Sequence, residues 1–153
     1  MIVVSACLAG EKCRYDGKDN KTNPINELVE KKQAVIVCPE VLGGLPVPRE
    51  PAEIINGTAD DVLEGKAKVI TKQGKDVTNA FLKGAHEALQ VVKKVGATKV
   101  ILKESSPSCG SNFVYDGTFS NYKISGQGIT AALLRKHGIE VISEKQVEKG
   151  IGI

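Results

Sequence analysis

Short apolar runs rich in β-branched residues recur along this chain and predict buried strands. Four of these runs, at residues 2–6, 34–37, 99–103 and 140–143, have the length and composition of strands in a sheet that is covered on both faces. The segments between them are long enough to return the chain to the same end of the sheet. This spacing predicts parallel strands joined by right-handed crossovers.

Helical patterns occupy much of the chain between these strands. One helix is predicted to begin after Asn23, with a proline in its first turn. A long helix is predicted with Asp76 or Thr78 as its cap and Gly96 at its end. A last helix is expected at Ile129–Arg135. The long helix has an apolar stripe at helical spacing, formed by Val77, Phe81, Leu82, Ala85, Ala88, Leu89 and Val92.

The alternation of strand and helix predicts the fold class. It favours an α/β fold of three layers, in which a mainly parallel, Rossmann-like sheet is flanked by helices on both faces. A chain of 153 residues has the size of one domain, and we expect residues 1–153 to form a single domain.

Three segments interrupt this alternation of strands and helices. Residues 39–51 contain three prolines beyond Pro39 and a Gly–Gly pair, so no regular element is predicted there. Such a loop is either functional or a plain surface crossover stiffened by proline. Residues 104–128 are also expected to be largely irregular. Residues 52–74 form a small excursion that holds a strand, a helical turn and a second strand, at 52–55, 60–63 and 67–71.

Cysteines stand where three of the strand patterns stop. Cys7 follows the first strand, Cys38 follows the second, and Cys109 lies a few residues beyond the third. In a parallel α/β sheet the segments that leave the strand ends meet at one edge, where such folds place their ligands. We therefore expect the three thiols to converge on a metal or iron–sulfur centre with one open position. For any one cysteine alone, packing as a small hydrophobe is the alternative.

The fourth cysteine, Cys13, lies on the loop after Cys7 and is near enough to join the same site. If it is a ligand, the centre is fully ligated and suits electron transfer or a structural role. If it is not, the metal keeps an open position for a substrate, and we favour this second interpretation. The sequence does not decide between the two.

Polar side chains flank the same strand ends. A carboxylate beside a metal can serve as general base for water, and an arginine or lysine can orient an anion or a polarised carbonyl. For any one of these residues, a surface turn or salt bridge is the competing interpretation. The two histidines fall in helical patterns and no Gly-x-Ser-x-Gly elbow is present, which argues against a serine hydrolase. The candidates are Arg14, Asp16, Glu40, Arg49, Glu50, Lys103, Glu104, Ser105, Ser106 and Ser108.

Charge and composition limit the kinds of partner that the sequence supports. The formal net charge is only +3, with basic and acidic residues interspersed, and the chain has no Trp. Neither a phosphate-neutralising face nor a base-stacking platform for nucleic acid is therefore indicated. No apolar run has the length of a membrane span, and the N-terminal run has the pattern of a strand and not of a signal peptide. We expect a cytoplasmic protein, in which cysteines are thiols or metal ligands and not disulfides.

Taken together, these motifs resemble the thiouracil desulfurase (desulfidase) family, once catalogued only as a domain of unknown function. The resemblance spans nearly the whole chain in one order. It implies a [4Fe–4S] cluster held by Cys7, Cys38 and Cys109, whose open iron takes up the sulfur of a thiolated base. The implied reaction is a non-redox desulfuration in which water supplies the replacing oxygen. The matching segments are Ser5–Gly10, Arg14–Gly17, Cys38–Glu40, Gly43–Leu45, Pro48–Arg49, Asp76–Thr78, Phe81–Ala85 and Lys103–Gly110.

The same resemblance suggests roles for the polar candidates. Glu40 and Ser105, supported by Asp16, would activate water and contact the substrate, a small thiolated pyrimidine such as thiouracil. Substrate-binding roles would fall to Arg14, Arg49, Lys103, Glu104 and Ser108. Two other functions compete with this one. The first is a non-catalytic metal or iron–sulfur module that uses all four cysteines for electron or sulfur relay, and the second is a nucleotide- or anion-binding domain without a metal.

Overall fold

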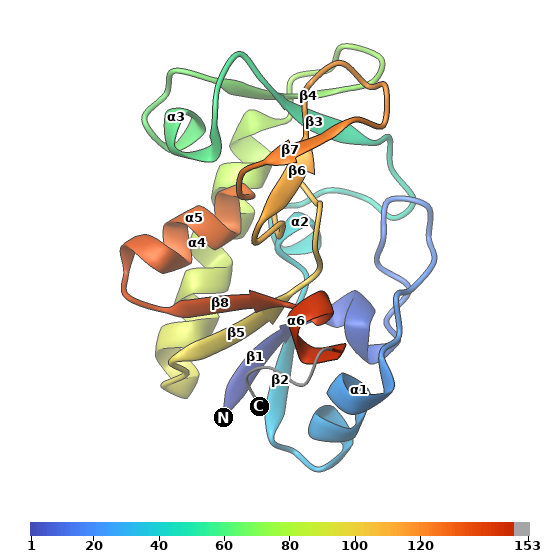
Figure 1. Cartoon of the computed structure of the whole chain (residues 1–153), viewed down its shortest axis with the longest axis vertical. Helices are drawn as coiled ribbons and strands as arrows, with labels where there is room; N and C mark the ends of the chain where they lie inside the picture. The colour runs from blue at the N-terminus through green and yellow to red at the C-terminus, as the bar shows by residue number, and fades with distance from the viewer. Residues whose placement is uncertain (149–153) are drawn as a thin grey trace.

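A four-stranded parallel sheet forms the centre of the protein, whose computed structural model describes residues 1–148 (Figure 1). Each strand agrees with its predicted run to within one residue, and the parallel arrangement is confirmed. The spatial order is β2 (Ala34–Val37), β1 (Ile2–Ser5), β5 (Lys99–Leu102) and β8 (Glu140–Ser143). The two strands from the second half of the chain, β5 and β8, lie on one side of the first strand, β1, and the strand β2 lies on its other side.

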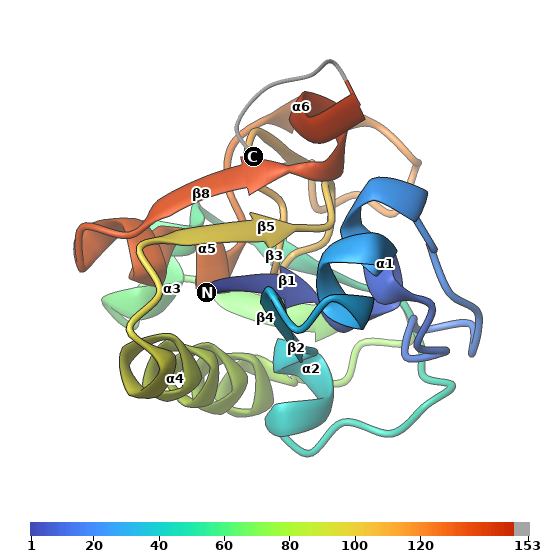
Figure 2. The same cartoon turned by 90° about the horizontal axis from the view of Figure 1, so that it is seen from below.

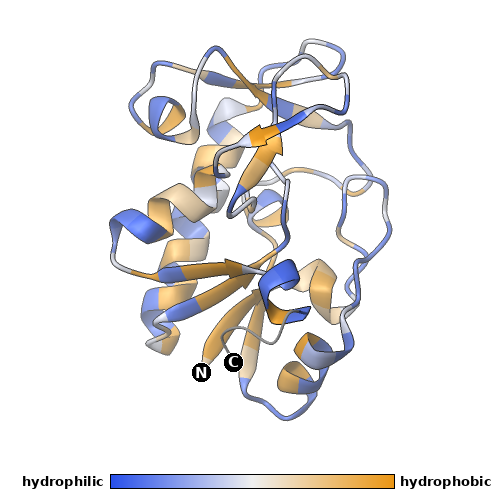
Figure 3. Cartoon of the chain, viewed as in Figure 1, coloured by the Kyte–Doolittle hydropathy of each residue, from blue (hydrophilic) through white to orange (hydrophobic). Residues whose placement is uncertain are grey.

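Helices cover both faces of this sheet, which confirms the predicted layers (Figure 2). Successive strand residues point to opposite faces, so Val3 belongs to one core cluster and Val4 to the other. The strands stand out as apolar against mostly polar loops (Figure 3). No helix within residues 1–148 is long and apolar enough to cross a membrane. One face is covered by α4 (Thr78–Val95) and α5 (Ile129–Lys136), the other by η1 (Ala6–Ala9), α1 (Asn23–Glu30) and α6 (Glu144–Glu148).

Helix α4 follows the predicted apolar stripe. Its buried side includes Phe81 and Leu89, which pack in the same core cluster as the sheet. The residue at the N-cap position is Val77, which makes no side-chain cap hydrogen bond, so the prediction of Asp76 or Thr78 as the cap is wrong. The Asp76 carboxylate accepts a hydrogen bond from the Thr78 amide at 2.9 Å, in a turn just before the helix. The helix ends at Gly96, whose φ of +69° is the left-handed conformation that favours glycine.

Helix α2 (Pro39–Leu42) lies in the segment that was predicted to be irregular, so that prediction is wrong for these four residues. A proline in the first turn of a helix lacks only an amide that would have no partner there. The helix is also held by close packing on α4, because a Cβ added to Gly43 or Gly84 would overlap main-chain atoms of the other helix. Residues 43–51 have no regular helix or strand.

Two antiparallel hairpins stand beyond the ends of the parallel strands (Figure 1). The first agrees with the predicted excursion at residues 52–74, including its short helix. The second lies in the segment expected to be largely irregular; its three-residue strands are too short to produce a pattern in the sequence. The elements are β3 (Ala52–Ile55), α3 (Ala59–Leu63), β4 (Lys68–Thr71), β6 (Phe113–Tyr115) and β7 (Lys123–Ser125).

Candidate active site

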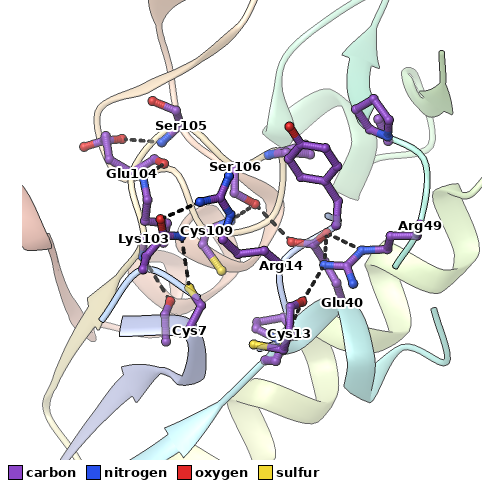
Figure 4. Close-up of a pocket in the computed structure, with 18 of the residues that line it drawn as sticks. Cys7, Cys13, Arg14, Glu40, Arg49, Lys103, Glu104, Ser105, Ser106 and Cys109 are labelled. Atoms are coloured by element: carbon purple, nitrogen blue, oxygen red, sulfur yellow. Dashed lines mark hydrogen bonds and ion pairs between the residues drawn. The ribbon is translucent and has the colours of Figure 1, made fainter. Parts of the chain in front are cut away.

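A cavity of about 290 Å³ lies between the ends of the parallel strands and the two hairpins. Its walls include the thiols of Cys7, Cys13, Cys38 and Cys109, and all four are free cysteines. The structure therefore brings together the three thiols that follow separate strands, together with the fourth from the first loop. Figure 4 labels Cys7, Cys13 and Cys109 among them. This is the convergence expected where parallel strands end.

The first two thiols are placed by short helices that begin directly after a strand. Cys7 lies in η1, and its Sγ accepts a hydrogen bond from Asn20 Nδ2 at 3.7 Å. Cys38 follows β2 and precedes α2, and its Sγ donates to the main-chain oxygen of Cys13 at 3.9 Å. Because α2 is packed on α4, the position of Cys38 depends on a contact between two helices.

The loop that carries Cys109 is organised by Glu104. Glu104 is 6 % exposed, and its carboxylate accepts hydrogen bonds from four main-chain amides and two side chains of the loop. Burial raises the pKa of Glu104, but hydrogen bonds from the amides of Asn112, Phe113 and Ser105 outweigh it and hold the pKa below its usual value. A carboxylate in such a ring of amides acts as the anchor of the loop.

The N-terminus of α5 holds the other side of the same loop. Its first amides donate to loop carbonyls, from Ile129 to Pro107 O and from Thr130 to Ser108 O, both at 2.8 Å. The Ser108 and Thr130 hydroxyls are also hydrogen-bonded, at 2.7 Å. These bonds satisfy amides that a helix start leaves without a partner inside the helix. Cys109 is therefore held between Glu104 and α5.

The four thiols differ in acidity because of their neighbours. A hydrogen bond with the Cys13 side chain lowers the pKa of Cys7 and brings that of Cys38 to about 7. The pKa of Cys13 is raised by the same two hydrogen bonds, since its thiol is the proton donor. Burial raises the pKa of Cys109 well above its usual value. Thiolate is the form of cysteine that binds metals, and Cys7 and Cys38 are closest to it.

Glu40 lies across the cavity from Cys7 in a network with Arg49 and Ser106 (Figure 4). Arg49 donates to Glu40 Oε2 from Nε at 3.1 Å and from Nη2 at 2.9 Å, and this ion pair is largely buried. Ser106 Oγ donates to Glu40 Oε1 at 3.2 Å and accepts from the amides of Ser108 and Cys109. A single serine thus links the carboxylate to the Cys109 loop.

Lys103 brings a positive charge to the Cys7 side of the cavity. Its ammonium group pairs with Glu144 at 3.2 Å and donates to Glu104 O at 3.0 Å. Its charge adds a smaller lowering of the Cys7 pKa, after the hydrogen bonds from Cys13 and Asn20. Glu144 follows the end of β8, so the rule that located the cysteines at strand ends could also have found it.

The other candidate residues fall into two groups. Arg14 and Ser105 line the cavity, and Arg14 donates to Asn20 Oδ1 at 2.9 Å. Asp16 stands outside the lining and pairs with Arg14 at 3.1 Å, and Ser108 is buried against α5. Ser106, to which the sequence assigned no role, is the serine bonded to Glu40, while Ser105 lies on the Glu104 side (Figure 4). Asn20 lies in an irregular loop and carried no signal in the sequence.

The donor atoms of this cavity fit a soft metal centre. Within residues 1–148 no three side chains of His, Cys, Asp or Glu are arranged to hold one metal ion. Four free thiols nevertheless line one cavity, and thiolates select iron–sulfur clusters or soft ions over magnesium or calcium. An iron–sulfur cluster takes one thiolate at each iron and so spans wider sulfur spacings than a single ion does. The residues present fit such a cluster.

Fold and site together define an α/β protein with a thiol-lined cavity at the ends of its parallel strands. This chain belongs to the 2-thiouracil desulfurase family, whose model matches residues 2–146. It is 54 % identical over 147 residues to the protein YbbK of Bacillus subtilis (strain 168), covering 96 % of this chain and 97 % of YbbK. It is also similar to the structure of the [4Fe-4S]-dependent thiouracil desulfidase TudS. That match has 44 % identity and a TM-score of 0.85, and it covers 97 % of this chain and 93 % of TudS.

Proposed function

We propose that this protein, acting as a single domain, is an iron–sulfur-dependent desulfidase of thiolated pyrimidines such as thiouracil. In this proposal Cys7, Cys38 and Cys109 hold a [4Fe–4S] cluster and leave one iron open to the substrate. The observation that carries it is the convergence of these thiols, from separate strands, on one cavity. Membership of the family and the similarity to TudS support the same chemistry.

The cluster, when bound, supplies a Lewis-acidic iron with affinity for the soft sulfur of a thiocarbonyl. The chain's own residues bind it, orient the base and move the proton of the water that replaces the sulfur. The overall change is hydrolytic: a C=S bond and water give a C=O bond and hydrogen sulfide, with no net oxidation or reduction.

Glu40 is the residue best placed to take a proton from that water. Its Oε2 already accepts two hydrogen bonds from Arg49, whereas Oε1 accepts one from Ser106. Oε1 therefore has a lone pair available, and we assign it as the proton acceptor. The two hydrogen bonds from Arg49 fix the orientation of the carboxylate, as a general base requires.

Five further residues complete the assignment. Arg14 lines the cavity, and we assign it to donate to an oxygen of the base. The ammonium of Lys103 balances part of the negative charge that thiolates bring to the Cys7 side. Ser105 lines the cavity and is assigned to contact the substrate. The Glu104 carboxylate and the Ser108 hydroxyl are bonded to the chain itself, so we assign both of them to positioning the Cys109 loop.

The test is a desulfuration assay under anaerobic conditions. The protein is reconstituted with iron and sulfide, incubated with 2-thiouracil, and sampled for uracil and released sulfide. We expect equal amounts of both products from the wild type and neither from Cys109→Ser, because Cys109 supplies one of the three thiolates. Equal release by the two proteins would contradict the proposal.

A further inference from the structure

The proposed function leaves Cys13 without a role, although it lines the same cavity as the three proposed ligands. Its side chain is half-buried, lines the same cavity and packs against the core cluster that contains Cys7. In Figure 4 Cys13 and Cys109 stand on different sides of the cavity. All four cysteines line this one cavity.

The main chain at Cys13 is also anchored at the cavity. Arg49 Nη2 donates to Cys13 O at 3.2 Å with the same nitrogen that bonds Glu40. Cys38 Sγ donates to the same oxygen at 3.9 Å. Two residues further along, Tyr15 O accepts from the Arg49 amide at 2.6 Å. The loop is thus tied to the proline-rich segment at two points, which hold the Cys13 thiol beside the other sulfurs.

We propose that Cys13 is the fourth protein ligand of the cluster in the substrate-free protein and is replaced there by the sulfur of the substrate. This inference rests on the proposed function. In the exchange the iron–sulfur bond to Cys13 breaks as the bond to the substrate sulfur forms. No electron is transferred, and the released Cys13 thiolate takes up a proton. An iron without a thiolate is exposed to loss on oxidation. The bond to Cys13 therefore protects the cluster when no substrate is bound.

Oxidative loss of iron tests this assignment without measuring turnover. Reconstituted wild type, Cys13→Ala and Lys12→Ala, an exposed neighbour on the same loop, are each treated with one equivalent of ferricyanide per cluster. Iron content and electron paramagnetic resonance are then recorded. We expect Cys13→Ala to begin with four irons and to convert to a [3Fe–4S] cluster. The wild type and Lys12→Ala should keep all four irons.

The outcomes separate this inference from the proposed function. Equal iron loss in the wild type and Cys13→Ala overturns the role of Cys13 and leaves the three-cysteine cluster standing. A Cys13→Ala protein that folds but takes up no cluster overturns the three-cysteine assignment itself, and this inference with it. Alkylation of the loaded wild type, read by mass spectrometry, gives a second measurement. We expect Cys13 to be labelled during turnover of excess 2-thiouracil and protected without it, and equal labelling overturns the inference.

Discussion

Arg49 donates two hydrogen bonds to one carboxylate oxygen of Glu40, from Nε at 3.1 Å and from Nη2 at 2.9 Å. The two residues lie at opposite ends of the segment that begins with α2 and continues through three prolines. Their ion pair joins the two ends of this segment at the cavity wall. The other carboxylate oxygen of Glu40 accepts a hydrogen bond from Ser106. The Arg49–Glu40 ion pair therefore holds the irregular proline-rich loop at the site.

Replacing Arg49 by lysine tests the importance of the paired hydrogen bonds. Lysine keeps the charge but cannot present two fixed donors to one carboxylate. We expect Arg49→Lys to keep the cluster and to release sulfide about 10- to 100-fold more slowly, the usual cost of losing a group that orients a metal site. Steady-state assays with 2-thiouracil measure this, with iron content as the control. An unchanged kcat would show that the orientation of Glu40 is not important for the reaction.

Ser106→Ala removes the hydroxyl that joins Glu40 to the Cys109 loop. We expect kcat to fall about tenfold, as for the loss of one hydrogen bond to a charged group, with a smaller change in KM. Ser106→Thr keeps the hydroxyl and is the matched control, which should retain more of the activity. If the alanine and threonine variants have equal kcat values, the hydroxyl has no part in positioning Glu40.

Gly84→Ala tests the packing that places Cys38. A Cβ at Gly84 would overlap the carbonyl group of Pro39, at the first residue of α2. We expect a loss of roughly 1–3 kcal/mol in the free energy of unfolding, as for overpacked cores, together with a lower iron content after reconstitution. Urea denaturation measures the first effect. Lys83→Ala, at an exposed position on the same helix, should change neither quantity.

Glu104 gives a prediction for the dependence of stability on pH. Because the pKa of Glu104 is lowered in the folded protein, its charge stabilises the fold above the usual value of 4.5. This contribution is lost as the pH falls from 4.5 through the lower, folded pKa. We expect Glu104→Gln to be less stable than the wild type at neutral pH and to lose less stability across that acidic range. Parallel unfolding curves at each pH, with the same difference throughout, would contradict the assignment.

The sequence was sufficient to predict the larger elements of the fold. Helix α4 and the strand β5 were predictable because an apolar stripe along an 18-residue helix and a β-branched run are strong local patterns. The convergence of Cys7, Cys38 and Cys109 followed from the rule that parallel strands end at one edge.

The finer structure was not predictable, because it depends on contacts between distant segments. Helix α2 has only four residues, and its packing depends on Gly84, far along the chain. Ser105 and Ser106 are adjacent and chemically identical, so only the folded loop distinguishes the one that bonds Glu40. Four of the six hydrogen bonds to the Glu104 carboxylate come from main-chain amides of its own loop, and main-chain amides leave no signature in the sequence.

The central claim is that three thiols from remote parts of the chain hold one [4Fe–4S] cluster. The most direct test is the iron and sulfide content of four reconstituted variants, Cys7→Ser, Cys38→Ser, Cys109→Ser and Cys13→Ser, beside the wild type. We predict that the first three lose the [4Fe–4S] cluster and that Cys13→Ser retains it with four irons. A full cluster in Cys7→Ser, Cys38→Ser or Cys109→Ser, or its loss in Cys13→Ser, would contradict the account.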